Sequence, residues 1–112
     1  MSLFPNNSNR TNSEQKDKDL HPITLRLGAD ASLKKVMEFL PEFGFDTISP
    51  RPDYHEIYAR KEMFEYTLSF IEDFGKTHLT ILCYSEKRTF KLKNKLKELM
   101  AFLRDKLEKH IV

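Results

Sequence analysis

The chain has 112 residues, of which 39% are hydrophobic and 32% charged, and its formal net charge at neutral pH is +2. This composition fits one domain with a thin core, in which nine Phe and four Tyr supply much of the buried area. A single cysteine excludes an internal disulfide framework, and no apolar run has the length of a membrane-spanning helix. We therefore expect a cytoplasmic protein.

The N-terminal residues 1–20 are predicted to form a disordered tail, and residues 21–112 to form the single domain. Asn, Ser, Lys, Asp and Gln dominate the tail, which cannot bury enough apolar surface to offset its ordering entropy. From residue 23 the pattern changes, because Ile23, Leu25 and Leu27 alternate with polar residues. This alternation predicts a short strand that ends at Gly28.

A first helix is predicted after this strand, with Asp30 or Ser32 as its N-cap. Apolar residues then follow at helical spacing at Leu33, Val36, Met37 and Leu40. Pro41 disfavours continuation of the helix, and Gly44 is suited to a left-handed terminating residue. The helix should therefore end between residues 39 and 43.

Four strands are predicted in the middle of the chain, over residues 45–49, 54–61, 66–71 and 78–84. Residues 72–76 are predicted to be a hairpin connection in which Gly75 supplies a positive φ. The strand over 78–84 is apolar at alternate positions on both faces. It is therefore predicted to be central in the sheet and buried on both sides.

A long amphipathic helix is predicted to close the chain after a turn over residues 85–89. Its apolar stripe consists of Leu92, Leu96, Leu99, Met100, Leu103, Leu107 and Ile111. The resulting order is β-α-β-β-β-β-α. It predicts an α+β fold in which an antiparallel sheet of four to five strands carries two helices on one face.

Residues suited to catalysis or metal binding are present, but their spacing is unsuited to either. Cys83 and His78 lie five positions apart on one predicted strand, so their side chains point to opposite faces and cannot form a dyad. We expect Cys83 to be a buried, inert thiol. His21, His55, His78 and His110 have no ligand spacing, and the three glycines are too far apart for a phosphate-binding loop. We expect no enzymatic activity, no metal and no cofactor.

The main functional signal is a separation of charge along the chain. Nine Lys and Arg residues against three acids between positions 87 and 109 give a local charge of +6, so the rest of the chain carries −4. The excess is concentrated at Lys87, Arg88, Lys91, Lys93, Lys95 and Lys97. Like charges at i,i+4 and cations at a helix N-terminus each cost a few tenths of a kcal/mol, in total about 1–2 kcal/mol here. Residues that destabilise the helix or strand in which they lie tend to mark functional sites.

The sequence therefore predicts a non-enzymatic docking or adaptor module whose basic C-terminal helix binds an acidic protein partner. The alternative is nucleic-acid binding, or binding to an anionic membrane surface, because lysines and helix N-termini hold phosphates well. The competing structural explanation is that the lysine stems cover the edges of the core while their amines reach water.

Two further hypotheses concern aromatic residues. Tyr54, Tyr58 and Arg60 are predicted to share one strand face, which would suit base stacking or docking. Simple cross-strand pairing is the interpretation we favour for them. A third functional class is a carrier of a small apolar ligand, whose cavity would be lined by Phe39, Phe43, Phe64, Phe70, Phe90 and Phe102. We favour a filled core in its place.

Overall fold

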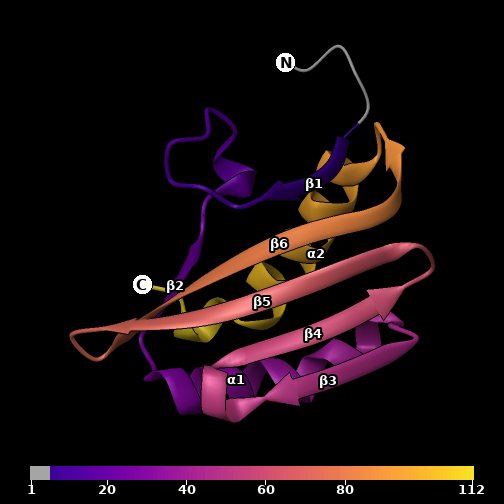
Figure 1. The fold of residues 1–112 in the computed structure, drawn as a ribbon. Helices are drawn as coiled ribbons and strands as arrows, with labels where there is room; N and C mark the ends of the chain where they lie inside the picture. Colours follow the sequence, from indigo (N-terminus) through magenta and orange to yellow (C-terminus); the bar gives the residue numbers. More distant parts are fainter. Residues whose placement is uncertain (1–5) are drawn as a thin grey trace.

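A computed structural model describes residues 6–112 of the chain (Figure 1). In chain order the strands and helices are β1 (Asn6–Arg10), β2 (Ile23–Leu25), α1 (Ala29–Phe39), β3 (Thr47–Arg51), β4 (Glu56–Lys61), β5 (Phe64–Asp73), β6 (Lys76–Thr89) and α2 (Leu92–Lys106). All six strands form one antiparallel sheet in the order β1-β6-β5-β4-β3, with β2 also paired to β6. The predicted α+β architecture is confirmed, with six strands in the sheet because residues 6–10 contribute one.

Both helices lie on the same face of the sheet, as predicted (Figure 1). Alternate residues of β4, β5 and β6 are buried beneath them, and the apolar stripe of α2 packs against this face. Within the described residues, no helix covers the opposite face. Leu82 and Tyr84 on that face are 40% and 41% exposed, so the prediction that this strand is buried on both sides is wrong. It is central only in the sense that β5 pairs with one edge and β1 and β2 pair with the other.

The N-terminal segment differs from the disorder expected over residues 1–20. Residues 6–10 form β1, and residues 18–20 form the short 3-10 turn η1 (Lys18–Leu20). The expectation for residues 1–5 lies outside the described residues. Strand pairing uses backbone groups and needs no apolar side chains, so a polar segment can pair with the free edge of β6. Thr11 and Leu20 add buried anchors, and the Thr11 hydroxyl accepts the Ile81 N–H at 2.9 Å.

Two strand boundaries change the position of residues predicted to be functional. β6 continues to Thr89, so the predicted turn over 85–89 is strand, and Lys87 and Arg88 lie on it. β4 begins only at Glu56, because His55 adopts a left-handed conformation with φ of 52°. Tyr54 therefore lies in a 3-10 turn and does not share the strand face of Tyr58.

A glycine precedes α1, and another ends the 3-10 turn (Leu40–Phe43) that follows it. Gly44 has φ of 91° and terminates the 3-10 turn that follows the helix, as predicted. The predicted N-caps Asp30 and Ser32 are wrong, because Gly28 occupies the N-cap position and has no side chain to provide a hydrogen bond. The Glu72 carboxylate of β5 takes that role and accepts the Ala29 N–H at 2.6 Å. A β-carbon at position 28 would lie 2.8 Å from the same carboxylate oxygen.

Replacing Gly28 with Ala should therefore displace Glu72 from the helix terminus. Gly28 has φ of −67°, so the substitution adds no backbone strain. We expect a loss of about 1 kcal/mol in the free energy of unfolding, the usual contribution of an N-cap. Urea unfolding of Gly28→Ala and Glu72→Ala measures the loss, and the double variant should lose no more than either single variant. Additive losses would show that the contact with Glu72 is not the cause.

Candidate anion-binding surface

The six cations predicted to bind an anionic partner fall into two groups. Three of them, all on α2, form ion pairs within the chain. Lys93 lies 3.7 Å from the Asp17 carboxylate, and Lys97 lies 3.0 Å from Asp17 and 3.6 Å from Asp19. Lys95 lies 3.9 Å from Glu98, one turn along the helix. The predicted mismatch between these lysines and the helix is therefore partly offset by acids of the N-terminal segment.

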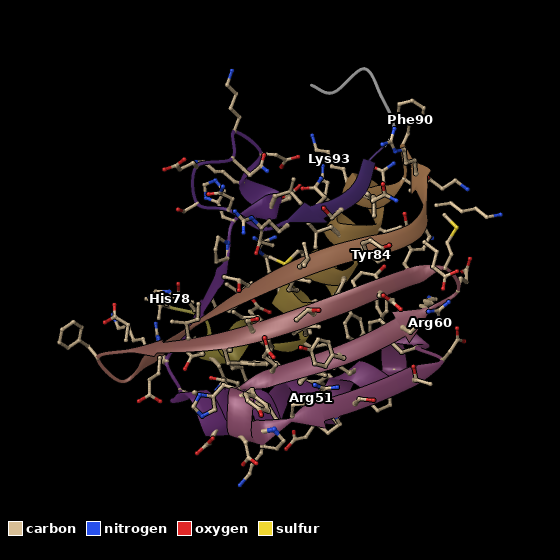
Figure 2. The ribbon with its side chains drawn as sticks, viewed as in Figure 1. Arg51, Arg60, His78, Tyr84, Phe90 and Lys93 are labelled. Carbon is tan, nitrogen blue, oxygen red and sulfur yellow. The ribbon has the colours of Figure 1, made fainter. Side chains whose placement is uncertain are left out.

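The other three cations, Lys87, Arg88 and Lys91, form no ion pair among residues 6–112. They flank Phe90, which is 69% exposed, at the junction between β6 and α2. Figure 2 shows Phe90 pointing outward at the end of β6, with Lys93 of α2 at the same end of the molecule. We call Lys87, Arg88, Phe90 and Lys91 the basic tip. The basic tip therefore combines an exposed aromatic ring with three cations that form no ion pair in the described chain.

An irregularity in strand pairing presents the strand part of the basic tip. Asn6 of β1 is opposite Thr89, but Ser8 is opposite Tyr84, so the register shifts across residues 85–88 of β6. The Ser85 hydroxyl donates a hydrogen bond to the carbonyl of Lys87 and closes this bulge. Bulges redirect side chains at the edge of a sheet. Both Lys87 and Arg88 are exposed here.

The start of α2 has neither a side-chain cap nor an acid in its own first turn. Lys91 occupies the N-cap position. The Lys91 N–H itself donates to the Thr89 hydroxyl at 3.1 Å. The partial positive charge of the helix N-terminus therefore adds to the charges of the tip.

The predicted second surface is only partly assembled, and its groups are used internally. Tyr58 and Arg60 lie on the open face of β4, whereas Tyr54 does not. Arg51 lies over the Tyr58 ring at 4.5 Å from its centroid, and the Tyr58 hydroxyl donates to Glu56 at 3.0 Å. This hydrogen bond raises the pKa of Tyr58. The arrangement agrees with the cross-strand pairing that we favour for these residues.

Arg60 also forms ion pairs with neighbouring acids of the chain. Figure 2 shows Arg60 on the open face of the sheet, with Arg51 and Tyr84. Its guanidinium pairs with Glu65 at 2.8 Å and with Glu86. These partners raise the pKa of Arg60, with Glu86 contributing most. The charge of Arg60 is therefore balanced within the chain, although only two of its five N–H donors are used.

Cys83 and His78 lie on opposite faces of β6, as predicted. Cys83 is buried, and burial raises its pKa to about 12. His78 lies on the opposite face, where a hydrogen bond of 2.9 Å joins it to the Thr24 hydroxyl. Within residues 6–112, no three His, Cys, Asp or Glu side chains are grouped as metal ligands. Neither helix of the described chain has the length and apolarity needed to cross a lipid bilayer.

Five of the six Phe residues considered for a ligand cavity belong to the core. Phe64 and Phe70 are buried, while Phe39, Phe43 and Phe102 pack against the core from its edge. The Phe43 and Phe102 rings meet edge to face with centroids 5.2 Å apart. Phe90 is the exception, and sequence reasoning misplaced it. Its position between Arg88 and Lys91, outside the apolar stripe of α2, is the signal that could have identified it.

No family model matches the sequence, and neither curated proteins nor solved structures provide a match. The case for any function therefore depends on the geometry and charge of the surface itself.

The ion pair between Asp17 and Lys97 predicts a pH dependence of stability. The hydrogen bond from Lys97 lowers the pKa of Asp17, and the same contact raises the pKa of Lys97. The pair therefore stabilises the fold above the ordinary Asp pKa of about 3.9, and this contribution is lost as pH falls through the lowered pKa. It is also lost at alkaline pH, as pH rises through the raised pKa of Lys97.

We expect the stability difference between wild type and Asp17→Asn to be constant near neutral pH and to close in acid. The amide introduced at this position keeps the oxygen that accepts the Asp19 N–H, so the turn is retained, while the charge and the oxygen that contacts Lys93 and Lys97 are removed. Urea unfolding across the acidic range tests this, with Asp53→Asn as an exposed acid outside any ion pair of the described residues. A difference that persists in acid would show that Asp17 acts through something other than its charge.

Proposed function

We propose that the protein is a non-enzymatic docking module that binds an acidic protein surface through the basic tip. The observation that carries this proposal is the grouping of Lys87, Arg88 and Lys91, unpaired within residues 6–112, around the exposed ring of Phe90. This grouping lies at a helix N-terminus that has no acid in its first turn. Such an arrangement costs stability, and a carboxylate-bearing partner would relieve that cost.

The two kinds of side chain at the tip support different parts of binding. Unpaired surface cations attract an acidic partner over several ångströms and raise the association rate, an effect that salt reduces. An aromatic ring that becomes buried on contact supplies the apolar area on which affinity depends. Phe90 is the only large aromatic residue in the tip and would be its anchor.

An acidic protein is a better match than nucleic acid or lipid. The rest of the chain carries a net −4, which opposes a polyanion that extends beyond the tip. The Tyr58 ring, a candidate for base stacking, has Arg51 over one of its faces. One Phe and three cations also provide little of the apolar area that stable membrane attachment requires.

The triple variant Lys87→Gln/Arg88→Gln/Lys91→Gln should separate binding from stability. We expect affinity for a labelled poly-glutamate peptide to fall about tenfold, the loss for three exposed charge contacts. Stability should stay equal or rise by a few tenths of a kcal/mol, because repulsion at the helix start is relieved. Fluorescence anisotropy and urea unfolding measure the two quantities.

The matched control is Lys34→Gln/Lys76→Gln/Lys109→Gln, which removes the same charge at positions without ion pairs in the described chain. It should bind almost as well as wild type. Equal losses in the two triple variants would show that net charge alone governs binding. Single-stranded RNA and phosphatidylserine vesicles are titrated in parallel, and tighter tip-dependent binding to either would replace the acidic-protein proposal.

Phe90→Ser tests the apolar anchor separately from charge. We expect weaker binding of an acidic peptide that also contains apolar residues, with a loss of about 1–3 kcal/mol for an aromatic anchor. Binding of plain poly-glutamate should hardly change, because that peptide offers no apolar partner. Since Phe90 is exposed, stability should remain as in wild type. Unchanged binding of both peptides would remove Phe90 from the proposed site.

A further inference from the structure

The acidic N-terminal turn occupies lysines that lie next to the basic tip. Asp17 contacts both Lys93 and Lys97 through one carboxylate oxygen, at 3.7 Å and 3.0 Å. Asp19, two residues further on, reaches Lys97 at 3.6 Å. We call residues 17–19 the acidic turn. Its two carboxylates thus contact the α2 lysines as carboxylates of another protein would.

The backbone of the acidic turn is held in place independently of these carboxylates. The Arg104 guanidinium donates hydrogen bonds to the carbonyls of Lys18, Asp19 and His21, at 3.1, 2.9 and 2.9 Å. The Leu20 side chain is 1% exposed and belongs to the core. The turn can therefore lose its ion pairs to α2 without leaving its position.

The ion pairs themselves lie at the surface, where they are weak and open to exchange. The Lys93 and Lys97 side chains are 55% and 35% exposed, and those of Asp17 and Asp19 are 26% and 65% exposed. Pairs between exposed groups contribute about 0.2–1 kcal/mol each, so a competing carboxylate can replace them at a small cost in free energy. Lys93 lies at the same end of the molecule as Phe90 (Figure 2).

Taking the proposed function as its premise, we infer that the acidic turn is an internal substitute for the acidic partner. A partner segment with closely spaced carboxylates displaces Asp17 and Asp19 from Lys93 and Lys97. The contact then extends from the basic tip along α2. Glu98 marks the limit of this surface, because it lies beside Lys97 in the same surface depression and pairs with Lys95.

The double variant Asp17→Asn/Asp19→Asn removes the internal competitor and keeps the turn. The amide introduced by Asp17→Asn retains the oxygen that accepts the N–H of residue 19, and the Arg104 contacts use only backbone carbonyls. The loss of each internal ion pair leaves a lysine available to the peptide, which should raise the affinity for poly-glutamate about two- to fivefold per pair. The affinity should also depend more steeply on salt, because two more cations are available.

The control is Asp53→Asn/Asp105→Asn, which removes the same charge where the described residues show no ion pair. Fluorescence anisotropy with poly-glutamate compares it with wild type, the acidic-turn variant and the basic-tip variant. The inference is supported if only the acidic-turn variant gains affinity. It is overturned if the control gains as much, or if the acidic-turn variant binds as wild type does.

Failure of the inference differs from failure of the proposed function. If wild type binds and the basic-tip variant does not, but the acidic-turn variant gains nothing, only the inference fails. If no variant binds, both fail. In the wild type, lysine side-chain NMR signals of residues 93 and 97 should shift on binding. Shifts confined to Lys87 and Lys91 would also overturn the inference.

Discussion

The structure depends on β6, a strand of 14 residues whose backbone groups must be paired along both edges. β5 pairs with one edge over ten successive residue pairs, while β1 and β2 divide the other edge between them. Its inner face carries Leu79, Ile81 and Cys83 into the core beneath α2. The position of Thr89, where the strand ends, then decides where α2 starts and where the basic tip is presented. Much of what surrounds β6 follows from the need to pair this strand.

Sequence patterns predicted the elements that bury an apolar face. The stripe of α2 from Leu92 to Leu103, the alternation of β5 and the left-handed Gly44 follow local rules, and the structure agrees with them. Ile111, predicted to continue the stripe, lies beyond the end of α2, where it is extended and bridges Leu25. The patterns failed where backbone pairing or a distant side chain decides the outcome. β1 contains no large apolar residue, so its pairing with β6 left no hydrophobic signal. The cap of α1 is Glu72, 43 residues away from Ala29, and no local motif reveals it.

The candidate site was predicted by residue type but not by arrangement. All six cations lie near the start of α2, yet the distribution of their partners depends on where residues 17–19 dock. The expected disorder of those residues concealed Asp17 and Asp19 as partners. Phe90 was assigned to a hydrophobic group by its type, although its neighbours Arg88 and Lys91 indicate exposure. The six cations therefore form two groups in the folded chain. Lys93, Lys95 and Lys97 are paired with acids, whereas the cations of the basic tip have no ion pair in the described residues.

The difference between local and distant pairing of β6 has a consequence for the order of folding. The β5–β6 hairpin closes through Phe74 and Gly75, with φ of 51° and 80°, so its strands meet without closing a long loop. The pairing of Thr11 with Ile81 joins residues 70 positions apart, at a much larger loop-closure entropy. The N-terminal segment from β1 to the acidic turn (residues 6–19) should therefore join the sheet late during refolding and be among the first parts to open by local unfolding. Its brief openings would expose Lys93 and Lys97 even in the absence of a binding partner.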